Sequence, residues 1–492
     1  MSPYSLSLRL LAAVCSLSVL VFGADAARAA GSRGSSPRPS ISDVQVSHDS
    51  YLAHSEPAIA ENPKNPKNLI AASKFFTDPT HYEFKIGTFY STDGGQTWHD
   101  SGLLPGFQNY HLTSDVSIAF SSTGVAYVAV LGCDGGVCPG DGNRSGVFIS
   151  ISKDGGKTFA APVTVFEDTT GATFSDKPWI AVDQSSGSTA GTIYLAWNLD
   201  PIGDSSSCDA EKGNPLLRRK TIEATLSGMV VARSTDGGHT FSDPVQVAQF
   251  TAQQSYIGAI PAVGPNGQLS VVFSRVNCRN SQVGGIDLVT STDGGVTFSH
   301  PRPVANDVIP LPDHLKNGTF RNVTLPTFAI SPTGSMVVAW ADMRNGDADI
   351  LAARSGDAGK TWSKPIRVND DRLGDGKDQF QPALAVSPNG TFTCAWFDRR
   401  RDPKNRLIDE EIAQSRDGGR SFGRNIRVTQ KSWDPAIDAP EPEGRSSNTF
   451  IGDYQALAVD NRTAHPLWND TQNGISQEIR TAFMPVHLFT AK

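Results

Sequence analysis

STDGGQTW at residues 91–98 decides the fold, because the chain repeats this stretch five more times. The copies are SKDGGKTF at 152–159, STDGGHTF at 234–241, STDGGVTF at 291–298, SGDAGKTW at 355–362 and SRDGGRSF at 415–422. The aspartate can accept hydrogen bonds from backbone N–H groups that follow it, and Gly-Gly tolerates the positive φ of a tight hairpin. We therefore predict a structural hairpin around each of Asp93, Asp154, Asp236, Asp293, Asp357 and Asp417.

Each copy lies between two predicted strands, and two more apolar strands precede each such pair. The first of the four has the form x-Pro-x-Ile-Ala-Val, as at 177–182, and the second often ends in an aromatic residue, as at 194–197. Successive motif aspartates are about 65 residues apart on average, so residues 41–486 hold about seven units. Four-stranded units repeated around a ring form a β-propeller. The sequence predicts an all-β, seven-bladed β-propeller, with a six-bladed ring as the alternative.

The seventh unit, which begins near Asp453, has no Asp motif and no fourth strand before the chain ends. The stretch ISDVQV at 41–46 resembles the fourth strand PVQV at 244–247. We predict that this N-terminal stretch supplies the missing strand and closes the ring. Residues 41–492 then form a single propeller domain.

The first forty residues predict export. Arg9 precedes an apolar run at 10–22 that is too short to span a bilayer, and small residues follow it. We assign residues 1–30 to a signal peptide and 31–40 to a flexible leader, which makes the protein secreted or periplasmic. No later segment is apolar enough to span a membrane. The net charge of −7 argues against a nucleic-acid partner, and we expect a monomer.

Export permits disulfide bonds in the mature chain. We predict one between Cys133 and Cys138 and another between Cys208 and Cys278, with two separate thiols as the alternative for the second pair. Cys394 lies in a strand-like segment and is predicted to be a buried free thiol. No zinc-ligand spacing occurs, and no cofactor is expected. The acidic loops at 134–141 and 369–378 leave a structural calcium ion open.

These motifs resemble the Asp-box, or BNR-repeat, β-propellers of the sialidase superfamily over nearly the whole mature chain. The resemblance implies that the Asp motifs lie on the face away from the active site, and that extracellular carbohydrate is the substrate. Sialidases of this group use a tyrosine paired with a glutamate, an aspartic acid and three arginines, the first of them in an Arg-Ile-Pro motif. This chain contains no Arg-Ile-Pro and has Glu56-Pro57 in its first blade, which argues against hydrolysis of sialic acid itself.

Three residues that do not repeat between blades stand out as candidates for the site: Asp78, His81 and Tyr454. Asp78, in a first-blade loop that also contains His81, matches the position of the group's proton donor; an Asx-Pro turn is the alternative. Tyr454, near the start of the seventh blade, is a candidate nucleophile if Glu443 or Glu441 takes its proton, and a packed aromatic otherwise. His111 precedes the second blade and has a similar structural alternative.

Arginines follow the second strands of three consecutive blades at Arg275, Arg344 and Arg399. Their guanidinium groups suit a carboxylate or sulfate of a substrate. The alternative is an Asp–Arg pair that caps each blade, because Asp342 precedes Arg344 by two residues and repetition is typical of scaffolding. We therefore expect a secreted propeller that acts on acidic glycans as a glycoside hydrolase or lyase. A non-catalytic propeller that binds glycan or protein is the alternative function.

Overall fold

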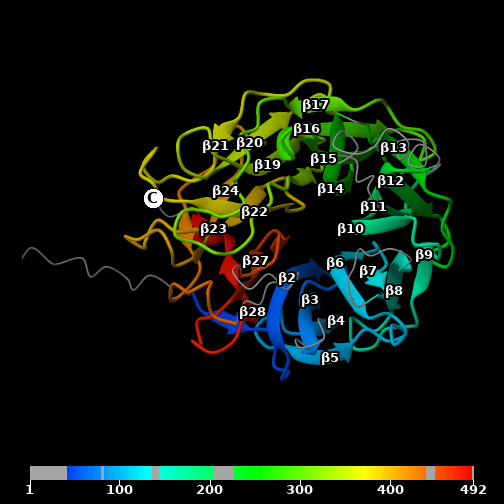
Figure 1. Ribbon diagram of the computed structural model, residues 1–492, viewed down its shortest axis with the longest axis horizontal. Coiled ribbons are helices and arrows are strands. Elements are labelled where there is room, and N and C mark those ends of the chain that lie inside the picture. The colour runs from blue at the N-terminus through cyan, green and yellow to red at the C-terminus, as the bar shows by residue number, and fades with distance from the viewer. Residues whose placement is uncertain are drawn as a thin grey trace, which may run out of the picture. The chain divides into compact units, whose positions relative to one another are not determined.

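Seven antiparallel sheets follow one another around a ring, and each sheet is one blade (Figure 1). The computed structural model describes residues 41–78, 83–135, 143–202, 226–251, 253–438 and 449–489. In this part of the chain the elements are strands, apart from one short 3₁₀ helix, η1 (Val486–Phe489). The predicted seven-bladed, all-β propeller is confirmed, and the six-bladed alternative is wrong.

In blades 1 to 6 the four strands are hydrogen-bonded in chain order, with the first strand nearest the centre of the ring (Figure 1). Blades 1 to 3 contain β2 (Leu52–Glu61), β3 (Leu69–Asp78), β4 (Glu83–Ser91) and β5 (His99–Leu103); β6 (Leu112–Phe120), β7 (Ala126–Cys133), β8 (Ser145–Ser152) and β9 (Val163–Asp168); and β10 (Thr173–Val182), β11 (Ile193–Pro201), β12 (Gly228–Ser234) and β13 (Val245–Gln249). Blades 4 to 6 contain β14 (Gln254–Val263), β15 (Leu269–Asn277), β16 (Gln282–Ser291) and β17 (Arg302–Ala305); β18 (Thr327–Ile330), β19 (Met336–Asp342), β20 (Asp349–Ser355) and β21 (Ile366–Arg367); and β22 (Gln379–Val386), β23 (Phe392–Asp398), β24 (Asp409–Ser415) and β25 (Ile426–Arg427). Blade 7 contains β26 (Ala456–Val459), β27 (Thr463–Asp470), β28 (Glu478–Ala482), β29 (Met484–Pro485) and β1 (Asp43–Gln45).

The N-terminal strand closes the ring as predicted. Strand β1 pairs antiparallel with β28 and becomes the outer strand of blade 7. The N–H of Val46 donates to the carbonyl of Ile479 at 2.7 Å, and the Val46 side chain is fully buried. Arg480 also donates to the Asp43 carboxylate at 2.8 Å. The first and last parts of the domain are thus held in one sheet.

Each Asp motif forms the hairpin between the third and fourth strands of its blade. In the first copy Ser91 Oγ donates to Asp93 Oδ1 at 2.8 Å, and Gly95 N donates to Ser91 Oγ at 2.9 Å. Thr97 donates to Asp93 through its N–H at 3.0 Å and through its hydroxyl at 2.6 Å. The serine–aspartate, glycine–serine and final Thr/Ser–aspartate contacts recur in the other five copies, so the motif is a scaffold device.

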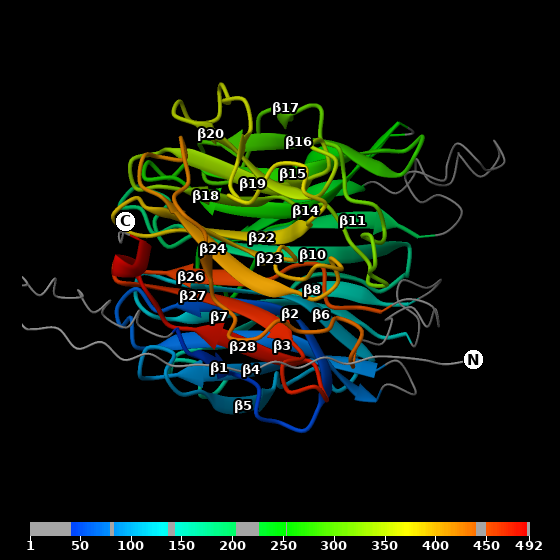
Figure 2. The ribbon, with the colours of Figure 1, turned by 90° about the vertical axis from the view of Figure 1, so that its left-hand side faces the viewer.

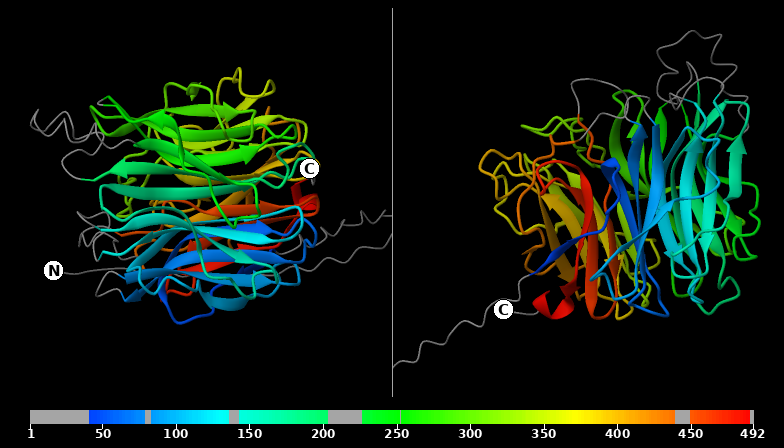
Figure 3. Two further views of the ribbon diagram at one scale, coloured as in Figure 1. Left: turned by 90° about the vertical axis from the view of Figure 1, so that its right-hand side faces the viewer. Right: turned by 90° about the horizontal axis from the view of Figure 1, so that it is seen from below.

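Strand direction assigns the loops to two faces of the ring. The strands run between the faces, as the side views show (Figures 2 and 3). Because neighbouring strands are antiparallel, the Asp hairpins share one face with the turns that join first and second strands. The loops between second and third strands and the connections between blades lie on the other face, which we call the front face.

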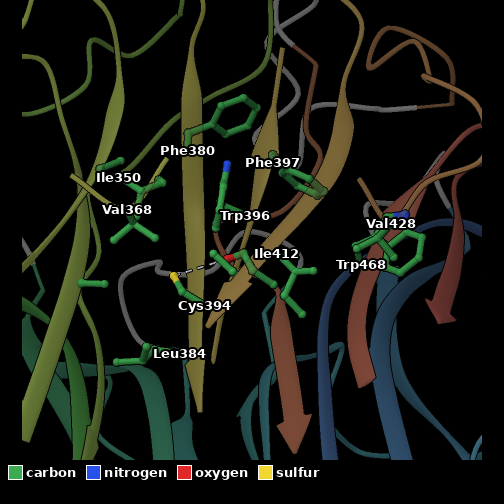
Figure 4. Packing of buried hydrophobic residues seen from close by; sticks show 14 of the residues in the cluster. Ile350, Val368, Phe380, Leu384, Cys394, Trp396, Phe397, Ile412, Val428 and Trp468 are labelled. Carbon is green, nitrogen blue, oxygen red and sulfur yellow. Dashed lines mark hydrogen bonds between the residues drawn. The ribbon is translucent and has the colours of Figure 1, made fainter. Parts of the chain in front are cut away.

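The core lies between adjacent blades, where apolar side chains of neighbouring sheets interdigitate. One cluster runs from blade 5 through blade 6 to blade 7 and includes Ile350, Leu384, Cys394, Trp396, Ile412 and Trp468 (Figure 4). Cys394 is a free thiol in this cluster and fully buried, as predicted. Burial raises the pKa of its thiol well above the ordinary value.

Two other described cysteines, Cys133 and Cys278, are disulfide-bonded. Their predicted partners, Cys138 and Cys208, lie outside the described residues, so the predicted pairings remain predictions. Among the described elements, no helix has the length and apolar character needed to cross a bilayer.

Candidate functional site

The innermost strands of five blades carry a β-bulge at one shared position. The pairing register of β2, β6, β10, β14 and β22 shifts there, and a residue with positive φ occupies each shift. These residues are Glu56 (φ 52°), Asp115 (52°), Lys177 (50°), Gly258 (74°) and Gln381 (48°). A non-glycine residue in this conformation is strained by roughly 1–2 kcal/mol, and a bulge re-aims its side chain. The innermost strands surround a central channel. In four blades a polar residue with a strained backbone therefore lies toward the front half of this channel.

Lys177 of blade 3 bridges to two other blades. Its Nζ lies 2.9 Å from Asp453 Oδ2 and 3.4 Å from Asp115 Oδ1. Arg321 Nη2 lies 2.7 Å from the same Asp453 oxygen. Lys177, Asp115 and Asp453 are buried, whereas the Arg321 side chain is 33% exposed. One carboxylate thus joins a buried ammonium to a guanidinium that reaches the solvent.

A second buried ion pair lies beside the first. Lys74 Nζ is 2.7 Å from Glu56 Oε2, and it is 4.6 Å from the centroid of the Phe450 ring. Arg321 is 4.9 Å from the centroid of that ring, so Phe450 links the two ion pairs through cation–π contacts. We call the whole group the mouth cluster; its members are Glu56, Lys74, Asp115, Lys177, Arg321 and Asp453.

Residues 313–324, which we call the strap, bring Arg321 to the cluster. The strap belongs to the connection between blades 4 and 5, yet it pairs with the segment that precedes blade 7. Thr449 N donates to Thr319 O at 3.0 Å, and Arg321 N donates to Thr449 O at 3.3 Å. Phe320 of the strap stacks on Phe380 of blade 6 at 5.4 Å between centroids. The strap therefore joins blades 6 and 7 on the front face.

A cavity of about 210 Å³ lies along the channel next to the mouth cluster. Its wall is mostly apolar, and its polar lining residues include Lys177, Gln381, Asp453, Tyr454 and Gln455. Tyr454 Oη and Gln381 Oε1 are buried and have no hydrogen-bond partner among the described residues. A buried polar group without a partner is unfavourable by about 1–3 kcal/mol. Gln455 Oε1 also lacks a partner among the described residues, so the cavity offers one unused hydroxyl and two unused acceptors to a bound molecule.

Two carboxyls share one face of blade 3 beside the mouth cluster. Asp176 on β10 lies opposite Asn198 on β11, and Asn198 Nδ2 donates to Asp200 Oδ2 at 2.6 Å. Since strand side chains alternate, Asp176, Asn198 and Asp200 point to the same side of the sheet. Diagonal neighbours across two strands have Cβ atoms roughly 7 Å apart or less. Asp176 and Asp200 therefore form an acid pair.

Burial raises the pKa of both acids of the pair, and the charge of Lys177 opposes this shift for Asp176. Burial and the charge of Asp176 raise the pKa of Asp200 to about 8, so Asp200 is mainly protonated at neutral pH. Burial also favours the neutral form of Asp453, but Arg321 and Lys177 outweigh it and hold the pKa of Asp453 well below its usual range. A proton donor and a fixed carboxylate thus occur at one site, an arrangement typical of acid–base catalysis.

The structure describes two of the predicted catalytic residues, Tyr454 and Asp78. Tyr454 precedes β26 and lines the cavity, where its ring meets Trp179 edge-on at 5.2 Å between centroids. Burial, followed by Glu56 and Asp115, raises the pKa of the Tyr454 hydroxyl well above its ordinary value. Asp78 is the last residue of β3 on the front face and is not among the described residues that line the cavity. Glu443, Glu441 and His81 lie outside the described residues.

The predicted arginine clamp does not form one group, because each arginine is engaged locally. Arg344 donates to both oxygens of Asp342, at 2.9 and 2.7 Å. Arg275 Nη1 donates to Asp287 at 2.8 Å. Arg399 is fully buried and donates to the carbonyls of Lys316 and Arg406. Arg275 and Arg344 thus show local Asp–Arg pairing, the alternative to a clamp, whereas Arg399 binds backbone carbonyls.

The Trp-x-Asp segments show why Asp–Arg pairs recur at the ends of the second strands. The indole N–H of Trp340 donates to Asp342 Oδ2 at 2.9 Å, and that of Trp396 donates to Asp398 Oδ2 at 3.0 Å. In blade 6 the residue that pairs with this aspartate is Arg400, whose Nε lies 2.9 Å from Asp398 Oδ2, and not Arg399. The aspartate therefore satisfies a buried indole and an arginine of its own blade.

Metal binding finds little support in the described part of the chain. No group of three or more His, Cys, Asp or Glu there is arranged to hold an ion. In the loop at 369–378, for which the sequence left calcium open, Asp370 accepts from Arg400 at 2.7 Å and Asp378 accepts from Asn405 at 2.6 Å. We therefore propose no calcium site in this loop, and part of the other candidate, 134–141, lies outside the described residues.

The sequence-based prediction missed most of the mouth cluster. A signal was present: Glu56, Lys177 and Gln381 each precede a proline inside a predicted strand. Proline lacks the N–H of the strand ladder and is confined to edges and bulges. A polar residue before such a proline therefore indicates a position that recurs in several blades while its residue type differs from blade to blade.

Comparisons with known proteins agree with the fold. A family profile described as a BNR repeat-like domain matches residues 225–467, and one described as a BNR/Asp-box repeat matches residues 89–100. No curated protein sequence is significantly similar to the chain.

Solved structures resemble the chain in fold. A Dyadobacter fermentans protein of unknown function is 13% identical, with a TM-score of 0.50, and the match covers 91% of this chain and 100% of that one. An ulvan lyase is 12% identical, with a TM-score of 0.48, and the match covers 90% and 96% of the two chains. An α-L-arabinanase from Penicillium chrysogenum is 14% identical, with a TM-score of 0.46, and the match covers 91% and 99%. At such identities the likeness concerns the fold alone.

Proposed function

Because this chain belongs to the Asp-box (BNR-repeat) β-propellers, we propose that it is exported and cleaves a glycosidic bond of an extracellular glycan at its front face. The observation that carries this proposal is the pair Asp176 and Asp200, two carboxyls on one face of blade 3 beside the mouth cluster. Arg321 is part of that cluster and reaches the solvent, so it is available to the same substrate.

Asp200 and Asp176 have complementary roles in the proposed hydrolysis. Asp200 is mainly protonated at neutral pH and donates its proton to the glycosidic oxygen as the bond to the anomeric carbon breaks. A water molecule attacks the anomeric carbon, and Asp176, whose ionised form the adjacent Lys177 favours, accepts the proton of that water. The charge of Asp176 is also one reason why Asp200 keeps its proton.

Asp78 and Tyr454 keep narrower roles. Asp78 is the competing proton donor, since it also lies on the front face. Tyr454 is a neutral phenol whose free hydroxyl can donate to a sugar oxygen that enters the cavity. A nucleophilic Tyr454 would need a base such as Glu443.

The test is a cleavage assay with the purified protein on neutral, uronic-acid-containing and sulfated oligosaccharides. Mass spectrometry separates the two reaction classes, because hydrolysis adds water to the products and elimination does not. We expect Asp200→Asn to lower kcat about 10²–10⁴-fold with little change in substrate binding. Asp307→Asn changes a front-face aspartate that is 83% exposed, and it is the matched control. A large loss in Asp78→Asn with none in Asp200→Asn would reverse the assignment of the donor.

A non-catalytic glycan-binding propeller is the second candidate. The mostly apolar cavity wall and the engagement of Asp453 by two cations favour it. In that case the wild-type protein binds oligosaccharides from the panel and cleaves none of them.

A further inference from the structure

A groove of about 590 Å³ on the front face is lined by four cations and one acid. The cations are Lys316, Lys377, Lys404 and Arg406, and the acid is Asp375. The groove lies where three front-face loops meet: the strap, the connection from blade 5 to blade 6, and the loop between β23 and β24. The chain as a whole has a net charge of −7, so this groove is a local reversal of sign.

Buried polar contacts hold the backbone of the groove in place. Arg399, fully buried, donates to Lys316 O at 3.0 Å and to Arg406 O at 3.1 Å, and its guanidinium lies 5.2 Å from the centroid of Phe320. It therefore ties the strap to the loop of blade 6. Asn317 Nδ2 also donates to Lys404 O at 2.7 Å. The predicted clamp residue Arg399 is thus a positioning residue for the loops that carry the cations.

Two ammonium groups of the groove remain available to a ligand. Lys377 donates to the Asp402 carbonyl, and Arg406 is 2.7 Å from Asp434. Lys316 and Lys404 are exposed, and neither has an ion-pair partner among the described residues. A fixed backbone with free ammonium groups suits a multiply charged anion.

We propose that this basic groove binds the acidic groups, sulfate or carboxylate, of an anionic glycan. The inference rests on the proposed function in one respect: the glycan held there is the chain that the front face acts on. Continuity along the strap supports this, because Lys316 in the groove and Arg321 in the mouth cluster are five residues apart. The mouth cluster and acid pair contain Glu56, Asp115, Asp176, Asp200 and Asp453, so an anionic chain needs cations elsewhere on this face for its binding.

The experiment compares three polymers with one backbone: dextran sulfate, carboxymethyl dextran and neutral dextran. In titration calorimetry we expect the full-length protein to bind the two acidic polymers and not to bind neutral dextran. Binding of the acidic polymers should weaken as the salt concentration rises. The double variant Lys316→Gln/Lys404→Gln should bind acidic polymer about tenfold more weakly. Lys64→Gln/Lys67→Gln makes the same charge change on the opposite face and should bind like the wild type. Thermal unfolding checks that both variants keep the wild-type fold.

The outcomes separate this proposal from the previous one. Equal binding by the groove variant and the wild type, or an equal loss of binding in the control variant, would refute the proposal that the groove binds the acidic polymer. A response to dextran sulfate alone would restrict the ligand to sulfated glycans, and a response to carboxymethyl dextran alone would restrict it to uronic acids. Charge-dependent binding without cleavage of any oligosaccharide would refute the proposed hydrolysis and would still support binding at the groove.

Discussion

Removal of residues 41–47 should prevent the ring from closing. This segment contributes the fully buried Val46, the Asp43–Arg480 ion pair and the backbone bonds between β1 and β28. Burial of one valine side chain is worth about 2 kcal/mol and each net hydrogen bond about 1 kcal/mol, so the loss is on the order of 5 kcal/mol. Since folded domains are stable by roughly 5–15 kcal/mol, the truncated chain should be largely unfolded or close to it.

Urea unfolding followed by tryptophan fluorescence measures this loss. A truncation that begins at residue 41 is the control and should unfold at the midpoint of the full chain. Val46→Ala is the graded case, expected to lower the unfolding free energy by about 2 kcal/mol. A synthetic peptide of residues 41–48 should restore stability to the chain that lacks 41–47, because its place beside β28 is vacant. An unchanged midpoint after removal of 41–47 would refute closure by β1.

Three further predictions concern buried ionisable groups. Asp453→Asn leaves Lys177 and Arg321 without their shared carboxylate and should lower the unfolding free energy in urea by about 3–5 kcal/mol; a shift no larger than that of exposed Asp307→Asn would contradict the buried ion pair. The raised folded pKa of Asp200, about 8, contributes stability that is complete below its unfolded pKa near 4 and is lost as pH rises through 8. In thermal unfolding, wild-type protein should therefore lose stability relative to Asp200→Asn as the pH rises from 4 to 8. Any cleavage activity should fall above pH 8. If the stability of the two proteins changed with pH in the same way, Asp200 would not be protonated in the folded state. Cys394 should resist iodoacetamide in the native protein and react after denaturation, as peptide mapping by mass spectrometry can show; native labelling would mean that its cluster opens.

The fold was accessible from sequence because its determinants are local and repeated. A hairpin such as the one around Asp93 is specified within eight residues, so its chemistry can be recognised without knowledge of distant contacts. Ring closure was also accessible, since the seventh unit lacked a strand and residues 41–46 matched the missing one. Counting units and matching strand patterns sufficed for both.

The site was less accessible because its contacts join residues that are far apart in the chain. Lys177 and Asp453 are separated by 276 positions, and Arg321 and Asp453 by 132. Nothing in the local pattern around Lys177 indicates that a carboxylate of blade 7 faces it. Tyr454 was found because it breaks the repeat, whereas Asp176 and Asp200 were missed because acids near strand ends also occur in scaffold positions.

Arg399 shows a different limit of prediction from sequence, because two adjacent arginines, Arg399 and Arg400, have different roles. Alternation along β23 holds only to Asp398, the last residue of that strand. Beyond it the backbone turns, so Arg400 returns to Asp398 while Arg399 points inward between Lys316 and Arg406. Sequence alone could not decide which of two adjacent arginines meets solvent.

The two faces of the ring follow different rules, and this difference bears on function. Hairpins on one face are nearly identical, so substitutions there act on stability and should leave ligand preference unchanged. On the front face the same strand position carries Glu56, Asp115, Lys177 or Gln381 in a strained backbone conformation. If these side chains only stabilised the ring, glycine would fit the position without strain, as Gly258 does in blade 4. The presence of three charged residues and one glutamine at four strained positions is therefore better explained by what their side chains do at the mouth of the channel.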